Sequence, residues 1–429
     1  MFYRLSSSLC LLLAGAFMWG MTAVAAVQPL ILDAAVRKAL SASPELAAMK
    51  ARAKALAAIS DQVETLPDPY LSINMLNLPL DSLSFSQEAM TQLQLGITQA
   101  LPYPGKLALR AQAASQEADA VVAEVSEQRL QLVQAVKTVW WNIFYYDRAL
   151  EVVARNEALL SQFVNVAETR YQVGRGLQQD ILLAQLELSK LRDNTIRLQN
   201  RRENEAIRLN VLLDYPPNRP VQLPVTVDET LPVLASSNVL QTRAVASRPA
   251  LAAQHERMAA ARSRTDLAQK DYAPDFKLGA AYGLRSGHHA DGTRRADFGS
   301  VMLSMSLPLY AGSKQARAAD QRNAEWLAQK FWLQQQRDRV AVEVQQAMND
   351  YQRAGQQVTL FREEIIPQAQ QTVDAMLAGY QVGKVDFLNL VRSQSQLYDY
   401  ETEYWRALST ANQALARSVA AVGEENIYE

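Results

Sequence analysis

One short element occurs twice in this chain, and each copy lies inside a long stretch that is nearly free of proline. Tyr171-Gln172-Val173-Gly174 is followed by Arg175, and Tyr380-Gln381-Val382-Gly383 is followed by Lys384. The first copy lies in a stretch from Gly105 to Tyr215 that has no proline. Such a stretch predicts helix, and a glycine before a basic residue inside it predicts a turn. Each half of the chain is therefore predicted to form a long helical hairpin with this element near its tip.

Two segments in each half change from a helical period to a period of two. In the first pair, Leu71, Ile73 and Met75 alternate with Ser72 and Asn74. Such alternation over about ten residues is typical of strands with one apolar and one polar face, including strands that cross a bilayer. The four predicted strands lie at about 70–78, 92–100, 276–284 and 298–308.

The order of these elements repeats along the chain, which predicts a mainly α protein with a small transmembrane β part. The first repeat is residues 27–235, with its helical hairpin at about 105–214, and the second is residues 236–429, with its hairpin at about 313–423. Each repeat contains a helix, two strands and a long helical hairpin, in that order. In the second hairpin, the first helix is predicted to end near Glu364, ahead of Pro367.

Residues 1–26 have the pattern of a secretory signal peptide. Arg4 supplies the positive charge, residues 9–17 the apolar core, and Ala23-Val24-Ala25 the small-residue cleavage site. The one cysteine, Cys10, lies in this segment and lacks the sequence context of a lipidated cysteine. A mature chain without cysteine has no disulfide and no thiolate chemistry. The net charge of −1 gives no basic surface for nucleic acid.

No group of residues in the sequence predicts catalysis, a cofactor or a metal site. The histidines are His255, His288 and His289, and the adjacent pair lies in a predicted loop without a carboxylate or cysteine cluster at ligand spacing. Trp140-Trp141 and Tyr145-Tyr146 are interpreted as packing between helices. The chain is therefore predicted not to be an enzyme.

Four strands cannot close a barrel, and an open sheet edge in lipid would leave backbone groups unpaired. Closure therefore requires several chains. Three chains would give a 12-stranded β-barrel with an aqueous lumen, continued by a 12-helix α-barrel. Such an assembly is a duct through the outer membrane and the periplasm.

The chain resembles the TolC family of outer-membrane efflux channels over essentially the whole mature sequence. The paired repeats, the strand pair after each first helix, and Gly379-Tyr380-Gln381-Val382-Gly383 carry this resemblance. Residues Asn77 to Met90 and the segment Pro102-Tyr103-Pro104-Gly105-Lys106-Leu107 are similar to the heavy-metal branch, which includes the cobalt-zinc-cadmium and copper-silver channels.

The resemblance implies a homotrimer that docks on a periplasmic adaptor (membrane fusion protein) and an inner-membrane pump of the resistance-nodulation-division type. It places the adaptor contacts at the two tips. These residues are Tyr171, Val173, Gly174, Arg175, Val382, Gly383 and Lys384.

The resemblance also implies a gate just past the tips. The family's gate tyrosine falls on Tyr380 and its first-repeat aspartate on Asp180, so a hydrogen bond between these two side chains is expected. The acidic positions of the second repeat carry Asn389 and Arg392 instead, and Val385 replaces the arginine after the tip, so the chain departs from the family pattern there.

The leading hypothesis is a passive efflux duct in the bacterial outer membrane that extends into the periplasm and exports heavy-metal cations. Drug efflux or type I protein secretion through the same duct is an alternative. A soluble periplasmic coiled-coil scaffold is an alternative of another class.

Overall fold

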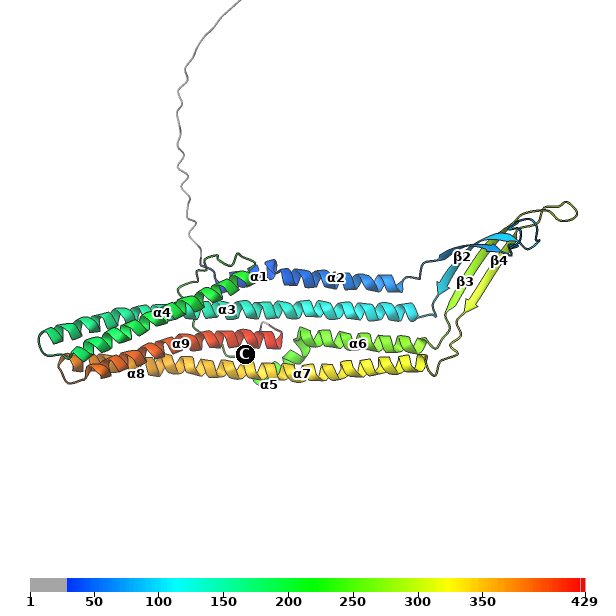
Figure 1. Ribbon diagram of the computed structural model, residues 1–429. Coiled ribbons are helices and arrows are strands. Elements are labelled where there is room, and N and C mark those ends of the chain that lie inside the picture. Colours follow the sequence, from blue (N-terminus) through cyan, green and yellow to red (C-terminus); the bar gives the residue numbers. More distant parts are fainter. Residues whose placement is uncertain (1–28, 425, 429) are drawn as a thin grey trace, which may run out of the picture.

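The computed structural model describes residues 29–424 and 426–428. The predicted signal peptide and Cys10 therefore lie outside the described residues. The described chain is an elongated rod, with one β-sheet at one end and two helical hairpin turns at the other (Figure 1). The helices are α1 Leu32–Ala42, α2 Pro44–Glu64, α3 Lys106–Gln172, α4 Gln178–Leu212, α5 Ser237–Ser247, α6 Pro249–Lys270, α7 Gln315–Leu360, α8 Ile366–Gln381 and α9 Phe387–Val422. The strands are β1 Tyr70–Leu76, β2 Gln92–Leu101, β3 Phe276–Arg285 and β4 Phe298–Met305.

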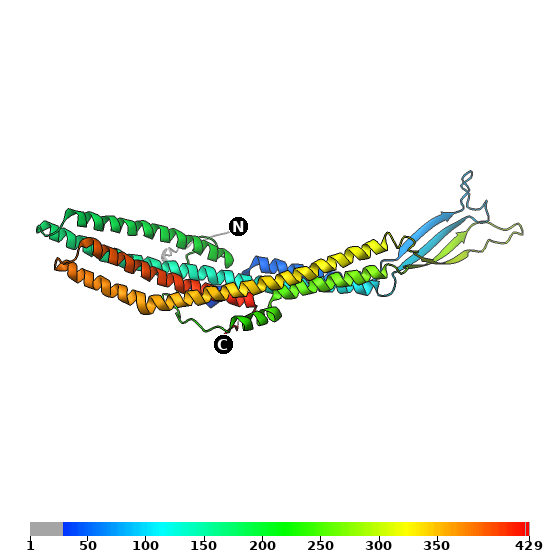
Figure 2. The same ribbon diagram turned by 90° about the horizontal axis from the view of Figure 1, so that it is seen from below.

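Two helical columns run the whole length between the sheet and the tips, one formed by α3 and one by α7 with α8 (Figure 2). The shorter helices stack end to end beside them, α9 in line with α6 and α4 in line with α2 (Figure 1). On the sheet side, neighbouring helices follow the order α2, α3, α6, α7, because each of these adjacent pairs is in contact. The helical layer therefore has two edge helices, α2 and α7, just as a sheet has two edge strands.

The joint between α9 and α6 is held by a buried arginine. Arg248, just ahead of α6, donates to the backbone oxygen of Ala420 near the end of α9. Its guanidinium also lies 2.8 Å from Glu127 on α3 and 3.3 Å from Glu343 on α7. Carbonyls at a helix end have no partner within their own helix, so Arg248 satisfies one of them and connects three helices.

The helix predicted to end near Glu364 continues to the tip, which corrects the sequence-based expectation. A proline inside an α-helix removes one N–H and clashes with the carbonyl four residues earlier. Here the residues Phe361–Ile365 widen into a π-helical turn, and the N–H of Ile366 bonds to the oxygen of Phe361, five residues back. The wider turn leaves room for Pro367 near the start of α8. The helical column therefore passes the proline without ending.

Both hairpin tips end in the same hydrogen-bonded turn. The N–H of Arg175 bonds to the oxygen of Arg170 at 2.8 Å, and that of Lys384 bonds to the oxygen of Gly379 at 2.9 Å. Bonds of this type, which reach back five residues, define the Schellman motif and require a left-handed residue. Gly174 and Gly383 supply it, with φ values of 70° and 76°.

The four strands form one antiparallel sheet in the order β1-β2-β3-β4. Its register brings apolar side chains from all four strands onto one face, because Ile73 pairs with Leu95, Leu95 with Tyr282, and Ala280 with Val301. The other face carries mostly small and polar residues, such as Ser72, Gly96, Ala281 and Ser300 in one row. The alternation seen in the sequence therefore corresponds to two chemically different faces.

The apolar face of the sheet is exposed in the single chain. Leu71, Val301 and Leu303 are 76%, 83% and 69% exposed. The two outer strands, β1 and β4, each pair with one neighbour only. Among the described residues, no helix combines the length and the apolar character needed to cross a membrane.

We expect Gly383→Ala to destabilise the second tip, because an alanine in the left-handed region costs about 1–2 kcal/mol. The amides at this tip should lose about 5- to 30-fold in hydrogen-exchange protection, measured by mass spectrometry. Gly355→Ala in α7 is the matched control. An added Cβ there would meet only the Leu231 side chain at 3.7 Å, so the substitution should leave the tip unchanged and favour the helix. Hydrogen-exchange protection equal to the wild type in Gly383→Ala would contradict the need for a left-handed glycine at this turn.

Candidate functional site

Below the two tips, the hairpins meet in a hydrophobic cluster. Its buried members come from α3, α4, α8 and the start of α9. They are Leu160, Phe163, Ala167, Ala184, Tyr380, Phe387, Leu390 and Val391. Burial of this apolar surface holds the two hairpins side by side, so the tips act as a pair.

The two tip tyrosines, equivalent in sequence, have opposite environments. Tyr171 is 48% exposed, whereas Tyr380 is 3% exposed and packs against the ring of Phe387 at 5.1 Å. The residue before the first tyrosine contributes to this difference. Arg170 precedes Tyr171, and its guanidinium reaches the second tip, where it lies 4.5 Å from the centre of the Tyr380 ring and donates to the Tyr380 backbone oxygen. Arg170 therefore joins the tips. Nothing in the sequence around Arg170 indicated this contact.

At each tip a glycine packs against a larger residue. The glycine comes second in the first repeat and first in the second repeat. At the first tip, a Cβ on Gly176 would lie 3.0 Å from Cβ of Arg170, and at the second a Cβ on Gly379 would lie 2.5 Å from Cγ2 of Val385. Such distances exclude a larger side chain at either glycine. Because Gly379 takes the place that Arg170 has in the first repeat, only one tip carries the bridging arginine.

The hydrogen bond expected between Tyr380 and Asp180 is absent from the single chain. The Tyr380 hydroxyl is buried without a hydrogen-bond partner in the described structure, and burial raises its pKa. The ring is held between Phe387 and the Arg170 guanidinium, which fixes the direction of the hydroxyl. A buried hydroxyl without a partner is costly, which makes this group a candidate for a contact that the single chain does not supply.

Asp180 lies in the first turn of α4 and is 8% exposed. Burial is the main cause that raises the pKa of its carboxyl, and the nearby charge of Asp386 raises it further. A backbone hydrogen bond from Leu177 and the charge of Arg170 act in the opposite direction. The two aspartates of the neighbouring tips therefore repel each other, which makes the ionised form of Asp180 less favourable at this position.

The remaining predicted site residues are exposed. Asn389 and Arg392 lie one turn apart on α9, and both side chains face solvent in the single chain. The seven predicted adaptor-contact residues, at 171, 173–175 and 382–384, are exposed as well. Asp180 and Tyr380 are thus in one cluster with Arg170, whereas Asn389 and Arg392 are not part of it.

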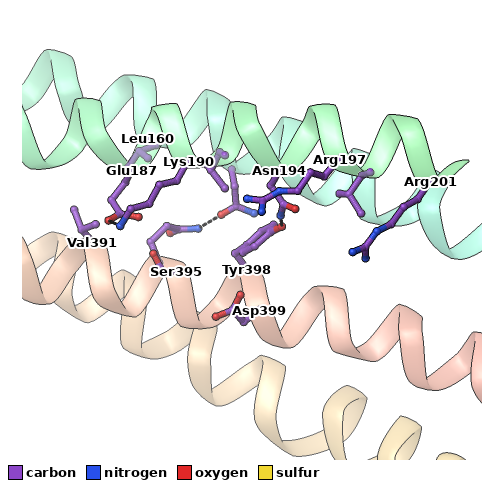
Figure 3. Close-up of a pocket in the computed structure, with 14 residues that line it drawn as sticks. Leu160, Glu187, Lys190, Asn194, Arg197, Arg201, Val391, Ser395, Tyr398 and Asp399 are labelled. Atoms are coloured by element: carbon purple, nitrogen blue, oxygen red, sulfur yellow. Dashed lines mark hydrogen bonds and ion pairs between the residues drawn. The ribbon is translucent and has the colours of Figure 1, made fainter.

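A groove of about 500 Å³ lies between α4 and α9, next to the hydrophobic cluster of the tips (Figure 3). Its buried floor contains an amide pair, in which Gln394 donates to Asn156 at 2.7 Å. Asn194 of α4 donates to the hydroxyl of Tyr398 of α9 across the groove. Figure 3 shows Lys190, Arg197 and Arg201 along the α4 side. No signal in the sequence indicated this groove, because its polar residues have the spacing of ordinary helix surface.

No group of three or more histidine, cysteine, aspartate or glutamate side chains in the described ranges could hold a metal ion. His288 lies on a short β-bridge with Arg294 in the loop between β3 and β4, and both loop histidines are exposed. The geometry of the described residues therefore supplies contacts between helices and an exposed pair of tips.

Comparison with known proteins gives a consistent family. The sequence pattern of the family described as "Outer membrane efflux protein" matches residues 35–214 and 240–424. A curated relative, an uncharacterized protein of Haemophilus influenzae, is 22% identical over 187 residues. The match spans 44% of this chain and 41% of that protein, so the chain covers about two fifths of its length.

Solved structures share the fold over most of their length. The outer-membrane channel OprN has a TM-score of 0.77 at 18% identity, with 91% of this chain and 89% of that chain covered. The outer membrane protein VceC from Vibrio cholerae has a TM-score of 0.75 at 18% identity, with 92% and 96% covered. CusC has a TM-score of 0.77 at 15% identity, with 92% of each chain covered.

We expect Asp180→Asn to stabilise the tips at neutral pH, because it removes a carboxylate that burial and Asp386 disfavour. A folded-state pKa above the unfolded one means that ionised Asp180 opposes folding. In the wild type, tip stability should therefore rise as the pH falls from 7 through that raised pKa, and then level off near the unfolded value. Hydrogen exchange, corrected for intrinsic rates, should show this rise and its absence in Asp180→Asn.

Asp386→Asn is the matched control for this series. It removes the second cause of the shift and leaves burial, so it should give a smaller gain in the same direction. Lower tip protection in Asp180→Asn than in the wild type would mean that the α4 dipole and the Leu177 bond outweigh burial, and that the expectation is wrong.

Proposed function

The chain belongs to the outer membrane efflux protein family, and from this premise we propose that three copies form a passive duct across the outer membrane and the periplasm. The observation that carries the proposal is the sheet. Its two outer strands lack a second neighbour, and one face is largely apolar and mostly exposed. A single chain of this kind cannot sit in lipid, because the backbone groups of β1 and β4 would go unpaired.

Ring closure satisfies both requirements at once. If β1 of one copy pairs with β4 of the next, three copies give twelve strands and leave no edge. The apolar face then meets lipid, and the small polar face lines a wet lumen. The helical layer has its edges on the same two sides, since α2 leads into β1 and α7 follows β4. The same rotation therefore closes the helices into a tube.

The length of the helices supports a role in the periplasm. α3 has 67 residues, which corresponds to about 100 Å. A rod of this length extends well past the membrane in which the sheet would lie. We propose that the exposed tips, with Val173 and Arg175 in one repeat and Val382 and Lys384 in the other, dock on a periplasmic adaptor. The adaptor would connect the duct to an inner-membrane pump of the resistance-nodulation-division type.

The same end would hold the gate. Asp180 and the Tyr380 hydroxyl are buried at the tips with unfavourable or unmet interactions. Asn389 and Arg392 are exposed on one side of α9. We propose that these four residues meet groups of a neighbouring copy in the closed duct. In that case Asp180→Asn changes single-channel conductance in planar bilayers, and conductance equal to the wild type would remove Asp180 from the gate.

The proposed cargo is heavy-metal cations, and the support is the similarity of residues 77–90 and 102–107 to the heavy-metal branch. Selectivity would lie in the pump, because the polar face of the sheet offers small side chains and no ligand cluster. Drug efflux and type I protein secretion would use the same kind of duct. The phenotype of a strain without this protein therefore decides between these cargoes.

We expect Leu303→Lys and Met302→Lys to have opposite outcomes, although the wild-type side chains are 69% and 51% exposed in the single chain. Leu303 lies on the apolar face, where a lysine in lipid costs about 2–4 kcal/mol. Met302 lies on the opposite face, where a lysine would reach water. Outer-membrane yield and heat-modifiable oligomer on gels should fall for Leu303→Lys and stay near wild type for Met302→Lys. A soluble scaffold would tolerate both substitutions. Unchanged yield and oligomer in both variants would therefore contradict the proposed duct.

A strain without this protein should lose tolerance to zinc, cadmium, cobalt or copper, because the pump would have no exit through the outer membrane. Growth across a concentration series of each metal measures the effect, and Met302→Lys on a plasmid should restore growth where Leu303→Lys does not. Unchanged metal tolerance with a gain in sensitivity to drugs would transfer the assignment to drug efflux. Loss of a secreted protein would transfer it to type I secretion.

A further inference from the structure

The lysine of the segment Pro102–Lys106 is buried where the helices meet the sheet. Lys106 begins α3 and is 2% exposed. Its Nζ lies 3.0 Å from Oδ1 of Asp271 and 3.0 Å from Oδ1 of Asp275. A lysine is almost never buried to this extent unless its charge is paired. The two carboxylates are about half exposed, so water still reaches the rim of the cluster.

The cluster ties together three of the four passages between helix and strand. Lys106 belongs to the passage from β2 to α3, and both aspartates belong to the passage from α6 to β3. Oδ1 of Asp275 also accepts the Tyr103 N–H at 2.7 Å. The backbone of Asp275 then bonds to Ser306, just past β4, through its N–H to the Ser306 hydroxyl at 2.8 Å and its oxygen to the Ser306 N–H at 2.9 Å.

The equivalent positions of the other repeat carry no such charges. Gly312 corresponds to Gly105, so Ser313 stands where the first repeat has Lys106. Pro69 corresponds to Pro274, so Leu66 and Tyr70 stand where the second repeat has the two aspartates. The charged cluster therefore lies between the two inner strands, β2 and β3, and away from the outer passage into β1.

The pairing keeps the cluster charged. Burial alone would lower the pKa of Lys106, but the hydrogen bonds and charges of Asp275 and Asp271 together raise it. Burial would likewise raise the pKa of Asp275, but the Tyr103 N–H and Lys106 lower it. Both shifts favour the ionised forms at neutral pH, so the contact persists over the pH range of the periplasm.

We propose that Lys106, Asp271 and Asp275 form an assembly clamp, which fixes the angle between the helices and the β2–β3 pair inside each chain before the chains meet. The inference rests on the proposed trimeric duct. β3 has 10 residues and a length of about 33 Å. A tilt of about 10° at its base would displace its far end by about 6 Å, which exceeds the 4.7–4.9 Å between paired strands. Without a fixed angle between the helices and the sheet, the β1 edge of one chain would not meet the β4 edge of the next in register.

The first test compares Lys106→Met, Lys106→Arg and the control Lys330→Met in the full chain. Lys330 is an exposed lysine on α7, away from the cluster. Methionine fills the same space without charge, and the half-exposed aspartates can hydrate, so the monomer should keep its helical content by circular dichroism. Trimer formation from denatured monomer in lipid bilayers should become at least tenfold slower in Lys106→Met. Lys106→Arg should recover most of the rate, and Lys330→Met should match the wild type.

The second measurement reports the angle itself. The one cysteine, Cys10, lies in the predicted signal peptide, so cysteines that carry spin labels can be introduced into the mature chain at Gln112 on α3 and Ala290 in the β3–β4 loop, both exposed. In detergent-solubilised monomer, the distance distribution between the labels should be narrow in the wild type, broad in Lys106→Met and narrow again in Lys106→Arg. A role in stability alone would leave the width unchanged.

Trimer formation at the wild-type rate together with a narrow distance distribution in Lys106→Met would contradict the clamp. It would not contradict the proposed duct. A wild-type chain that forms no trimer in bilayers would instead contradict the proposed function. If Lys106→Met fails to fold, the double variant Asp271→Asn with Asp275→Asn replaces it, because both charges opposite Lys106 are lost while the amide oxygen at position 275 can still accept the Tyr103 N–H. A narrow distribution in this double variant would then contradict the proposed clamp.

Discussion

The hydrogen-bonding need of edge strands governs this molecule. A four-stranded sheet leaves the outward backbone groups of β1 and β4 without partners, and lipid offers none. The exposed apolar face makes water an equally poor environment. In the proposed duct, neighbouring copies pair with the strand edges and lipid covers the apolar face. The helical layer has its edge helices, α2 and α7, on the corresponding sides. The proposed trimer therefore follows from the backbone groups and the apolar surface that one chain leaves unsatisfied.

The tips show how a duplicated sequence can serve two purposes. Both use the same Schellman turn with a left-handed glycine, so the backbone is nearly the same. The side-chain packing differs, because the large and the small residue have exchanged positions. Arg170 packs against Gly176 in the first repeat, and Val385 packs against Gly379 in the second. One tyrosine is exposed and the other buried beneath Arg170. Both tips therefore expose their turn residues, but only the second tip buries its tyrosine in the cluster between the hairpins.

Two buried basic residues lie at interruptions of the rod. Arg248 lies where α9 gives way to α6, and Lys106 lies where α3 begins below the sheet. Each has an uncharged counterpart in the other repeat, Ser43 and Ser313. A buried ion pair contributes little net stability compared with apolar packing, but it demands a defined geometry. Its use at joints is consistent with a role in alignment, because helices that meet end to end have no continuous backbone bonding to hold their direction.

The sequence by itself determined the period of each segment, and with it the order of helices and strands, the two-repeat plan and the turns at Gly174 and Gly383. These follow from local chemistry: side-chain alternation, the absence of proline and the need for a left-handed residue. The continuation of the α7 column past Pro367 did not follow, because a π-helical turn depends on packing that local propensity does not describe. The tertiary structure alone decided which residues far apart in sequence meet. Arg170 reaches Tyr380, Lys106 reaches Asp271 and Asp275, and the Tyr380 hydroxyl is left without Asp180. Such contacts depend on how whole helices are placed, and neither spacing nor composition encodes that placement in any one segment.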